Sequence, residues 1–355
     1  MQSRTGHAAR GGFPLEDIHA VLRDTPGIWE EMRGGRVLLL GGTGFVGRWL
    51  LESFLAANEA FSLKASAVVV TRSPERLATV APHLSSEPAV QVLRGELTRG
   101  RFPDGPFTHV IHAATAEGYS AQAAQAEAMV RGAVRLTRFA VEHEATALLL
   151  VSSGAVYDRM GRGPARIAEE QAVFLDALAP GRFYGECRRF MEALCCEAAR
   201  GSGLRVKIAR GFGFIGPGMR MDGRFAVMDF ISDALSGGPV VVGNTGRARR
   251  SLLYASDLAT WLWTILFRGG AERPYNMGSE HGCTIAQIAR LVAKSVGGQV
   301  PVVIQGNPEP AGGRIQYVPD TSRARLELGL HARVGIEEAV QKTLSFYASM
   351  SQSAA

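Results

Sequence analysis

Long apolar runs are missing from this 355-residue sequence: none approaches the roughly 18 consecutive apolar residues of a membrane-spanning helix. The first residues, Met1–Gly12, are basic and polar, and the apolar core of a secretory signal does not follow them. We therefore expect a cytoplasmic protein that does not bind membranes. With 46% hydrophobic residues, the chain can still bury a large core.

Cysteine is scarce, and the spacing of the four residues matches no metal-ligand pattern. Cys187, Cys195 and Cys196 fall on one expected helix, and Cys283 stands apart. This usage is typical of reduced thiols in a cytoplasmic protein. We expect no metal site, and we expect Cys195 and Cys196 to be buried.

Lysine is scarce as well: only four of the 39 basic residues are lysine, and the others are arginine. No basic run alternates with aromatic residues, which argues against nucleic-acid binding. The net charge of +6 suits a negatively charged small substrate. An arginine-biased codon usage would explain the composition equally well.

Three glycines, in contrast, are spaced three residues apart between an expected strand and an expected helix. Val37–Leu51 reads as a short apolar strand, a glycine turn and the first turns of a helix. Gly41 lets the chain turn tightly, Gly44 lets a diphosphate approach the backbone, and Gly47 lets the helix pack close to the sheet. We expect a dinucleotide site here; an ordinary glycine-rich turn is the alternative.

Strand and helix patterns alternate along the first half of the chain. Helical spacing follows the glycine turn, and a long alanine-rich helix is expected at Ala121–Glu142. The alternation predicts an α/β fold with a Rossmann-like, doubly wound parallel sheet, whose strand ends line the ligand crevice. The expected strands are Val37–Leu40, Ala65–Val70, Val90–Leu93, His109–His112 and Ala147–Val151.

Three regions are expected. Residues 1–35 form an N-terminal extension with one or two short helices between Pro14 and Met32. Residues 36–212 form the dinucleotide-binding domain, which later strands near 273–277 rejoin. Residues 213–355 mainly form a smaller α/β C-terminal domain that binds the substrate.

The end of the second strand indicates which dinucleotide binds. An acidic residue there would accept hydrogen bonds from the adenosine ribose and favour NAD, but this chain has Thr71-Arg72-Ser73. Arg72 can pair with a 2′-phosphate, and its neighbours can donate hydrogen bonds to it. We therefore favour NADP; alternatively Arg72 stacks on adenine or faces solvent.

Two further segments indicate acid–base chemistry. Ser153 follows the fifth strand, and Tyr184 opens an expected helix that carries Arg188 four residues later. That spacing places Tyr184 and Arg188 on one helical face. The nearby cation favours the phenolate, so Tyr184 can act as a general acid or base in hydride chemistry, and Ser153 can bind the same substrate oxygen.

Together these segments resemble the extended short-chain dehydrogenase/reductases, in particular the nucleotide-sugar epimerase and dehydratase group. The resemblance extends from Arg36 to Tyr347. It is carried by Gly41–Gly47, Val110–Ala114, Ser152–Tyr157, the Tyr184 segment, Gly216-Pro217, Arg250–Asp257 and Tyr275–Ser279.

The resemblance implies roles for individual residues. Ser153, Tyr184 and Arg188 would be catalytic, and His112 would pack beside the cofactor. The NAD(P) site would comprise Gly41, Gly44, Phe45, Val46, Gly47, Arg72, Glu96, Leu97, Ala113, Ala114, Tyr184 and Arg188. A nucleotide-diphosphate sugar would be bound by Ser153, Arg250 and Arg314. The resemblance also implies a homodimer that pairs through the helices at Ala121–Glu142 and Tyr184–Ala199.

Three departures from the family pattern bear on the reaction. Arg188 stands where the family has lysine; arginine keeps the charge but is larger, planar and harder to deprotonate. We expect a tolerated replacement, with impaired catalysis or a non-catalytic nucleotide-binding relative as the alternative.

Gly154 and Ala155 stand where the 4,6-dehydratases carry an Asp-Glu pair. This favours an epimerase or 4-ketoreductase over a dehydratase. Gly213 stands where asparagine is frequent, which alters the sugar contacts.

Overall fold

Two compact units make up the structure, a computed structural model. The first unit is drawn from residues 1–156, 182–210 and 259–275, and the second from 157–181, 211–258 and 276–355. The residues that the structure describes are 12–96, 98–100, 102–114, 122–157, 166–171, 182–297, 300–308 and 315–353.

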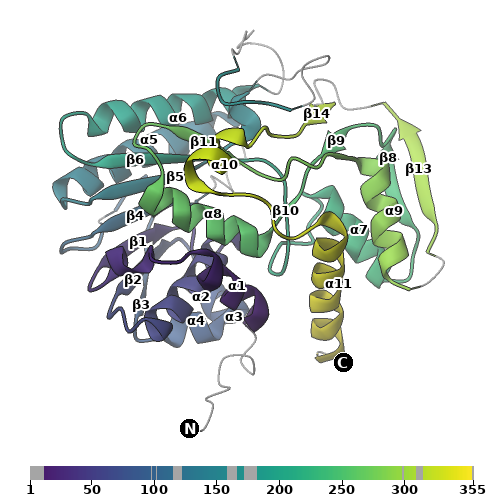
Figure 1. Cartoon of the computed structure of the whole chain (residues 1–355), viewed down its shortest axis with the longest axis horizontal. Helices are drawn as coiled ribbons and strands as arrows, with labels where there is room; N and C mark the ends of the chain where they lie inside the picture. The colour runs from purple at the N-terminus through teal and green to yellow at the C-terminus, as the bar shows by residue number, and fades with distance from the viewer. Residues whose placement is uncertain are drawn as a thin grey trace. The chain divides into compact units, whose positions relative to one another are not determined.

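A seven-stranded sheet with the order β11-β6-β5-β4-β1-β2-β3 forms the centre of the first unit (Figure 1). Its pairs β3–β2, β2–β1, β1–β4 and β4–β5 are parallel. The strand order reverses between β1 and β4, and ligands of doubly wound sheets bind at such a point. The expected fold class is therefore confirmed. The strands are β1 (Arg36–Leu40), β2 (Ser66–Thr71), β3 (Val90–Arg94), β4 (His109–His112), β5 (Ala147–Ser153), β6 (Arg205–Gly211) and β11 (Pro274–Met277).

Helices cover both faces of this sheet. In Figure 1, α5 and α6 run along one face, and α2 lies on the opposite face. The helices are α1 (Leu15–Asp24), α2 (Phe45–Ala60), α3 (Pro74–Val80), α4 (Pro82–Ser86), α5 (Gln122–Glu142), α6 (Phe183–Ala199) and α8 (Ala255–Arg268), with short 3-10 turns η2 (Trp29–Met32) and η3 (Gly154–Val156).

Alternating strand residues build the core beneath α5 and α6. Leu38, Val68, Val110 and Leu148 come from four adjacent strands and are at most 1% exposed. Successive side chains of a strand point to opposite faces, so their neighbours in sequence pack on the α2 side. Burying each such side chain contributes about 1.5–3 kcal/mol, so this cluster fixes the register of the sheet.

The cysteine expectation holds for only one of the two adjacent residues on α6. Cys195 is buried, whereas Cys196 is half-buried, because neighbouring residues on a helix point about 100° apart. Burial raises the pKa of the Cys195 thiol to about 11 and that of Cys196 to about 12. Both thiols are therefore held in the unreactive, protonated form.

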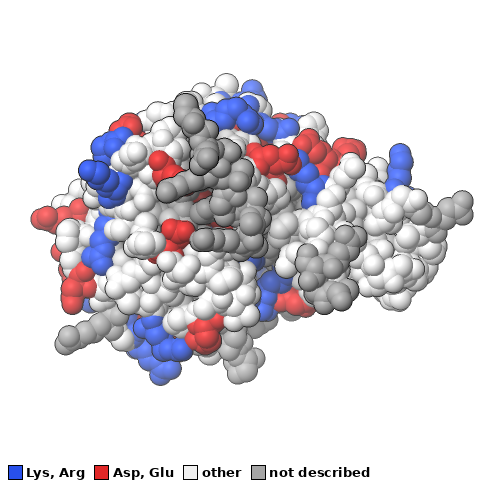
Figure 2. Space-filling model, turned by 90° about the horizontal axis from the view of Figure 1, so that it is seen from below, with Lys and Arg blue, Asp and Glu red and all other residues white. Residues whose placement is uncertain are grey.

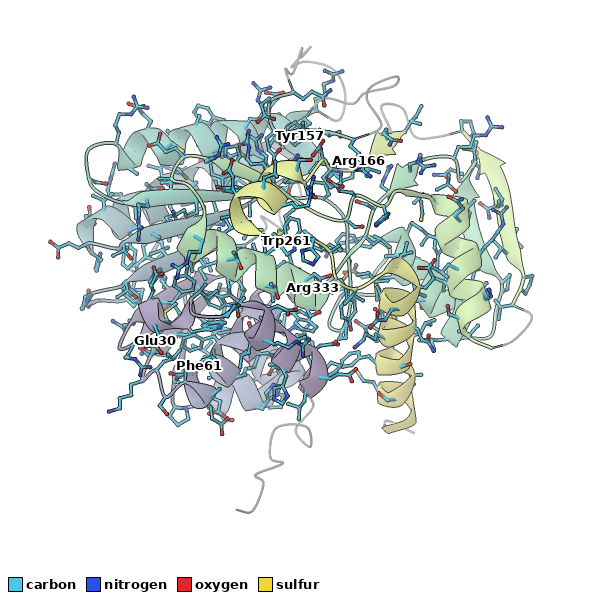
Figure 3. All side chains as sticks on the ribbon, viewed as in Figure 1. Glu30, Phe61, Tyr157, Arg166, Trp261 and Arg333 are labelled. Carbon is cyan, nitrogen blue, oxygen red and sulfur yellow. The ribbon has the colours of Figure 1, made fainter. Side chains whose placement is uncertain are left out.

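The N-terminal helices belong to the core of the first unit. Phe13 stacks on Trp49 of α2 with the ring centroids 4.5 Å apart. Trp29 is 2% exposed, and its ring lies 4.9 Å from that of Trp263 on α8. Near them at the surface, Arg33 bridges the Glu30 carboxylate and the Phe61 carbonyl, residues that Figure 3 labels.

The second unit contains three small sheets. β10 (Leu253–Tyr254) pairs with β7 (Phe214–Ile215), and β13 (Val302–Asn307) pairs with β8 (Val240–Asn244). The third has the order β12-β9-β14, from Cys283–Thr284, Arg249–Arg250 and Gln316–Tyr317. Its helices are α7 (Ala226–Leu235), α9 (Ile285–Ser295), α10 (Ser322–Leu328) and α11 (Ile336–Ser353).

Local signals explain where helices of the second unit start. Thr284 and Gln287 form a reciprocal capping box at the start of α9, which satisfies two backbone amides. Before α11, the Asp257 carboxylate accepts the backbone amides of Arg333 and Val334 at 2.9 and 3.0 Å. Both contacts satisfy backbone donors next to the beginning of a helix.

Acidic and basic side chains are intermixed over the face shown in Figure 2. Among the described residues, no helix is both long enough and apolar enough to cross a bilayer.

Candidate active site

The glycine turn after β1 has the conformation that its three glycines predict. Gly41 has φ +90°, and a Cβ there would lie 2.6 Å from the carbonyl carbon of Ala113. Gly47, in the first turn of α2, has no room either: a Cβ would overlap the Gly41 oxygen and lie 2.5 Å from Cα of Gly42. Only glycine fits these two positions without movement of the backbone.

Gly44 differs from the other two glycines because it is exposed and has an ordinary φ of −84°. A Cβ on Gly44 would meet only the Gly41 oxygen, at 3.3 Å. Its amide donates to that oxygen, and its carbonyl accepts from Arg48 at the start of α2. Its missing side chain is therefore not needed for packing against the described residues.

The turn lies where the strand order reverses. β1 ends at Leu40 and the neighbouring β4 at His112, so Gly41 and Ala113 follow adjacent strand ends. The Ala113 amide donates to the Leu40 carbonyl, and Ala113 and Ala114 are half-buried. Phe45 and Val46 open α2, whose first amides have no partner within the helix. A diphosphate would fit these donors.

Arg72 follows β2 at the same edge of the sheet and is exposed. Sequence reasoning missed its neighbour Arg94, whose Nη1 donates to the Arg72 carbonyl at 2.8 Å. The Nη2 atom of Arg94 pairs with the Glu75 carboxylate at 2.7 Å. The structure thus places two arginines at the position expected to read the ribose.

Glu96, expected to touch adenine, makes its contacts within its own turn. Its carboxylate accepts from the Thr98 hydroxyl at 2.9 Å and from Arg99 Nε at 2.6 Å. An adenine contact would compete with both bonds. Leu97, the other residue expected here, lies outside the described residues.

Tyr184 and Arg188 lie together on α6. Arg188 Nε donates to the Tyr184 hydroxyl oxygen at 3.0 Å, and Nη1 donates to the Val151 carbonyl at 3.2 Å. Arg188 is 3% exposed, whereas Tyr184 is 38% exposed. A buried cation therefore holds the oxygen of an accessible phenol through a charge-assisted hydrogen bond.

Ser153 ends β5, which runs two residues further than expected. Its hydroxyl accepts from the Ala155 amide at 3.1 Å within the short turn η3. A Cβ on Gly185 would overlap the Ala155 oxygen, so the start of α6 is pressed against this turn. The first turn of α6, which carries Tyr184, is thus anchored two residues beyond Ser153.

His112 ends β4 and is 2% exposed. Neither ring nitrogen has a hydrogen-bond partner among the described residues. Burial, together with the charge of Arg188, lowers the pKa of His112 to about 3. The imidazole is therefore neutral at ordinary pH, which agrees with a packing role.

Arg250, expected to bind the diphosphate, lies on the middle strand of a sheet in the second unit. Its guanidinium stands over the Tyr317 ring, 5.8 Å from the centroid, and Tyr317 is its register partner on β14. Tyr317 in turn packs on Phe212, with the centroids 4.7 Å apart. Arg314, the second expected arginine, lies outside the described residues.

Gly213 shows why the family's asparagine is absent from this chain. A Cβ there would overlap the Ser251 oxygen, and the Gly213 carbonyl accepts the Leu253 amide at 2.9 Å. The loop is packed around a glycine, so a side chain at this position would displace the backbone.

A family model described as the NAD dependent epimerase/dehydratase family matches residues 37–278. This chain belongs to that family. The match contains the glycine turn, Ser153, Tyr184 and Arg250, and it confirms the recognition made from the sequence motifs.

Known proteins similar to this chain differ in activity. UDP-glucuronic acid decarboxylase 1 of Xenopus tropicalis is 31% identical over 202 residues, which cover 56% of this chain and 46% of the relative. The chain thus spans about half the length of that relative.

Two solved structures share the fold. UDP-glucose 4-epimerase of Thermotoga maritima, with UDP-glucose, has a TM-score of 0.73 and 19% identity over 89% of this chain and 99% of that one. The dTDP-glucose 4,6-dehydratase DesIV of Streptomyces venezuelae, with NAD bound, has a TM-score of 0.74 and 20% identity over 88% and 97%.

Sequence reasoning assigned no role at the candidate active site to three nearby residues, Ser152, Glu192 and Arg210. Glu192 on α6 is buried; it accepts from Ser152 Oγ at 2.5 Å and from Arg210 Nη2 at 2.6 Å. Glu192 follows Arg188 by one further helical turn, which places it on the same face of α6, but this spacing does not reveal its partners.

The buried His112 predicts a pH-dependent stability. The unfolded chain binds a proton near the ordinary pKa of 6.5, but folded His112 does so only near pH 3. The unfolded state therefore binds more protons below pH 6.5, so stability is lost as pH falls. Between pH 7 and pH 5, the free energy of unfolding of the wild type should fall by about 2 kcal/mol relative to His112→Leu.

Urea denaturation at pH 7, 6 and 5 measures this difference. His281→Gln, which removes an exposed histidine, serves as the control and should leave the pH dependence parallel to that of the wild type. Parallel curves for wild type and His112→Leu would contradict the assignment of a buried, neutral imidazole.

Proposed function

We propose that this protein is an NAD(P)-dependent nucleotide-sugar epimerase or 4-ketoreductase. The observation that carries the proposal is the accessible Tyr184 phenol, held by the buried Arg188, on a helix whose start is anchored beside Ser153. These groups lie in the same unit as the glycine turn. The arrangement combines a dinucleotide-binding turn with one acid–base group, Tyr184.

The glycine turn fits a dinucleotide diphosphate. Neighbouring backbone atoms leave no room for a side chain at Gly41 or Gly47. Gly44 is exposed and is the N-cap residue of α2. Backbone amides at a helix start attract an anion, and the absence of a Cβ allows close approach. When bound, the nicotinamide supplies hydride transfer to or from the sugar carbon.

The chain's own residues supply the proton chemistry. Tyr184 removes the proton from the reacting sugar hydroxyl, or returns one to the corresponding ketone oxygen. Arg188 stabilises the negative charge on the phenol oxygen during this transfer. The Ser153 hydroxyl donates to the same substrate oxygen and orients it.

Gly154 and Ala155 favour epimerisation or keto reduction over dehydration. Eliminating water requires an additional acid and base, and neither residue carries an ionisable side chain. A 4,6-dehydratase remains the alternative. Decarboxylation of a nucleotide-linked uronic acid is a second candidate, because the Xenopus tropicalis relative is named for that reaction.

For the cofactor we propose NADP rather than NAD. Arg72 follows β2 and Arg94 ends β3, the strands expected to flank the adenosine ribose, and Arg94 engages Glu75. Guanidinium groups pair well with a 2′-phosphate. The family description names NAD, so the test compares both coenzymes by fluorescence titration. Tighter binding of NADPH supports this assignment, and tighter binding of NADH overturns it.

The nucleotide diphosphate of the substrate would pair with Arg250. Its guanidinium over the Tyr317 ring is partly exposed, and it can bind two phosphate oxygens at once. Arg314 is proposed as a second partner. Arg250→Gln should raise the KM for the nucleotide sugar more than it lowers kcat.

We also propose a cytoplasmic homodimer paired through α5 and α6. Phe190 on α6 is 55% exposed, so this pairing would bury a large apolar side chain. Light scattering of the purified protein tests the oligomeric state, with Phe190→Glu expected to shift it to monomer. A wild-type monomer would exclude this pairing.

The decisive experiment has two steps. Purified protein is denatured and the released coenzyme identified, and the native protein is then given UDP-glucose, dTDP-glucose and UDP-glucuronic acid and followed by NMR. Retained oxidised coenzyme with a new C4 epimer supports an epimerase. Formation of a 4-keto sugar with stoichiometric reduction of added NAD(P)⁺, which is keto reduction run in reverse, supports a reductase. Release of CO₂ from UDP-glucuronic acid would replace both with decarboxylation.

Arg188→Lys separates an enzyme from a non-catalytic relative. Lysine keeps the cation beside the Tyr184 oxygen, so we expect turnover within about tenfold of the wild type. Initial rates with the substrate identified above provide the measurement. Absence of turnover in both proteins, with coenzyme and nucleotide sugar still bound, would favour the non-catalytic reading.

A further inference from the structure

Three side chains spaced four residues apart lie on one face of α6, and two of them, Arg188 and Glu192, contact β5. Tyr184, Arg188 and Glu192 lie one above the other on this face. Arg188 bonds to the Val151 carbonyl, and Glu192 accepts the hydroxyl of Ser152, the next residue of the strand. The residue after that is Ser153.

Glu192 stands at the centre of a buried polar cluster. Its Oε1 accepts from Ser152 Oγ at 2.5 Å, and its Oε2 accepts from Arg210 Nη2 at 2.6 Å. Arg210 Nε lies 3.1 Å from both carboxylate oxygens. Ser152 is 6% and Glu192 5% exposed, so water does not compete for these bonds. Charge-assisted bonds of this length are strong and directional.

The cluster connects three neighbouring elements of the first unit, two strands and one helix. Ser152 is on β5, Arg210 is on the adjacent β6, and Glu192 is on the helix that covers them. At the other end of the same helix, Gly185 is pressed against the Ala155 carbonyl. The helix can therefore neither slide along β5 nor rotate without breaking a buried bond.

A buried ion-pair cluster of this kind adds little to the stability of the fold, but it fixes the position of the helix relative to the strands. Apolar side chains at positions 152, 192 and 210 could pack as well and would tolerate small shifts. A buried ion pair with a bidentate arginine has one favourable geometry, because any displacement leaves a charge unpaired. The reacting groups Ser153 and Tyr184 need such fixed spacing.

We propose that Glu192, Ser152 and Arg210 are positioning residues that set the separation between Ser153 and Tyr184. The inference rests on the proposed function of those two residues. It predicts that disturbing the cluster lowers the rate of chemistry without weakening the binding of coenzyme or substrate.

Kinetics of matched variants test the proposal. Ser152→Ala and Glu192→Gln should each lower kcat about 10- to 100-fold, with KM and coenzyme Kd within about threefold. Ser152→Thr keeps the hydroxyl and should recover most of kcat. Glu197→Gln removes an exposed carboxylate from the same helix and should change nothing. Unchanged kcat in folded Ser152→Ala, or a change confined to KM, overturns the proposal.

A second readout does not depend on turnover. Tyrosine labelled with ¹³C at Cζ gives one NMR signal per ring, and the Tyr184 signal is the one absent from Tyr184→Phe. Ser152→Ala and Glu192→Gln should move or broaden that signal, and Glu197→Gln should not. If the variants shift the Tyr184 signal but the wild-type protein has no turnover, the positioning role is retained and the proposed function is rejected. An unshifted signal in both variants would reject the positioning role.

Discussion

Tyr184→Phe is expected to lower turnover at least about a thousandfold while coenzyme affinity stays within about threefold. The phenol is accessible, and its oxygen accepts from the buried Arg188. Phenylalanine keeps the ring and removes only the group that exchanges a proton with the substrate. A thousandfold corresponds to about 4 kcal/mol of transition-state stabilisation, within the range for removal of a general acid–base group.

Tyr157→Phe provides the matched control. The Tyr157 hydroxyl is buried and donates to Asn276 Oδ1 at 2.6 Å, so it supports the fold of the second unit. Its loss should reduce the free energy of unfolding by about 1 kcal/mol and leave most of the turnover. Rates are normalised to coenzyme-binding protein in both variants. Retained turnover in Tyr184→Phe would reject the assignment of this residue as the acid–base group.

The fold was predictable because its signals are local. Apolar strands of four to seven residues alternate with amphipathic helices, and each pattern depends on neighbours within one or two turns. Leu38 and Leu40 point to one face of the sheet by strand geometry alone. The glycine turn was predictable for the same reason, since Gly41 and Gly47 lie within one strand–turn–helix unit.

The polar partners were not predictable because they come together only in the folded chain. Ser152 and Glu192 are 40 residues apart in sequence, and Arg72 and Arg94 are 22 apart. No short-range pattern distinguishes a glutamate that holds a serine from one that faces solvent. One local pair was not predicted either: Arg99 engages the carboxylate of Glu96, three residues earlier.

Gly213 shows an intermediate case. Comparison with the family motif identifies the missing asparagine, but only the structure gives the reason, which is the Ser251 carbonyl against its Cα. The sequence therefore located the departure from the family motif without explaining it. The close approach of the Ser251 carbonyl depends on backbone placement, which residue types alone do not encode.

Gly44→Ala and Gly47→Ala should separate coenzyme binding from folding, although the two glycines lie three residues apart. An added methyl at Gly44 meets only the Gly41 oxygen at 3.3 Å, and φ is already that of an ordinary residue. The free energy of unfolding should fall by about 1 kcal/mol, as for alanine at a helix N-cap. The coenzyme Kd should rise about 100-fold, because the methyl occupies the space left for the diphosphate.

Gly47→Ala should instead destabilise the protein by about 3 kcal/mol or more, because its methyl overlaps the backbone of Gly41 and Gly42, which cannot swing aside. Guanidinium denaturation and fluorescence titration with NADPH and NADH measure the two effects. Normal coenzyme affinity in Gly44→Ala would place the diphosphate elsewhere. Normal stability in Gly47→Ala would mean that the turn can open. Weakened coenzyme binding in Gly44→Ala would assign Gly44 to the ligand, and lost stability in Gly47→Ala would assign Gly47 to the fold. The shared glycine motif alone does not distinguish these two roles.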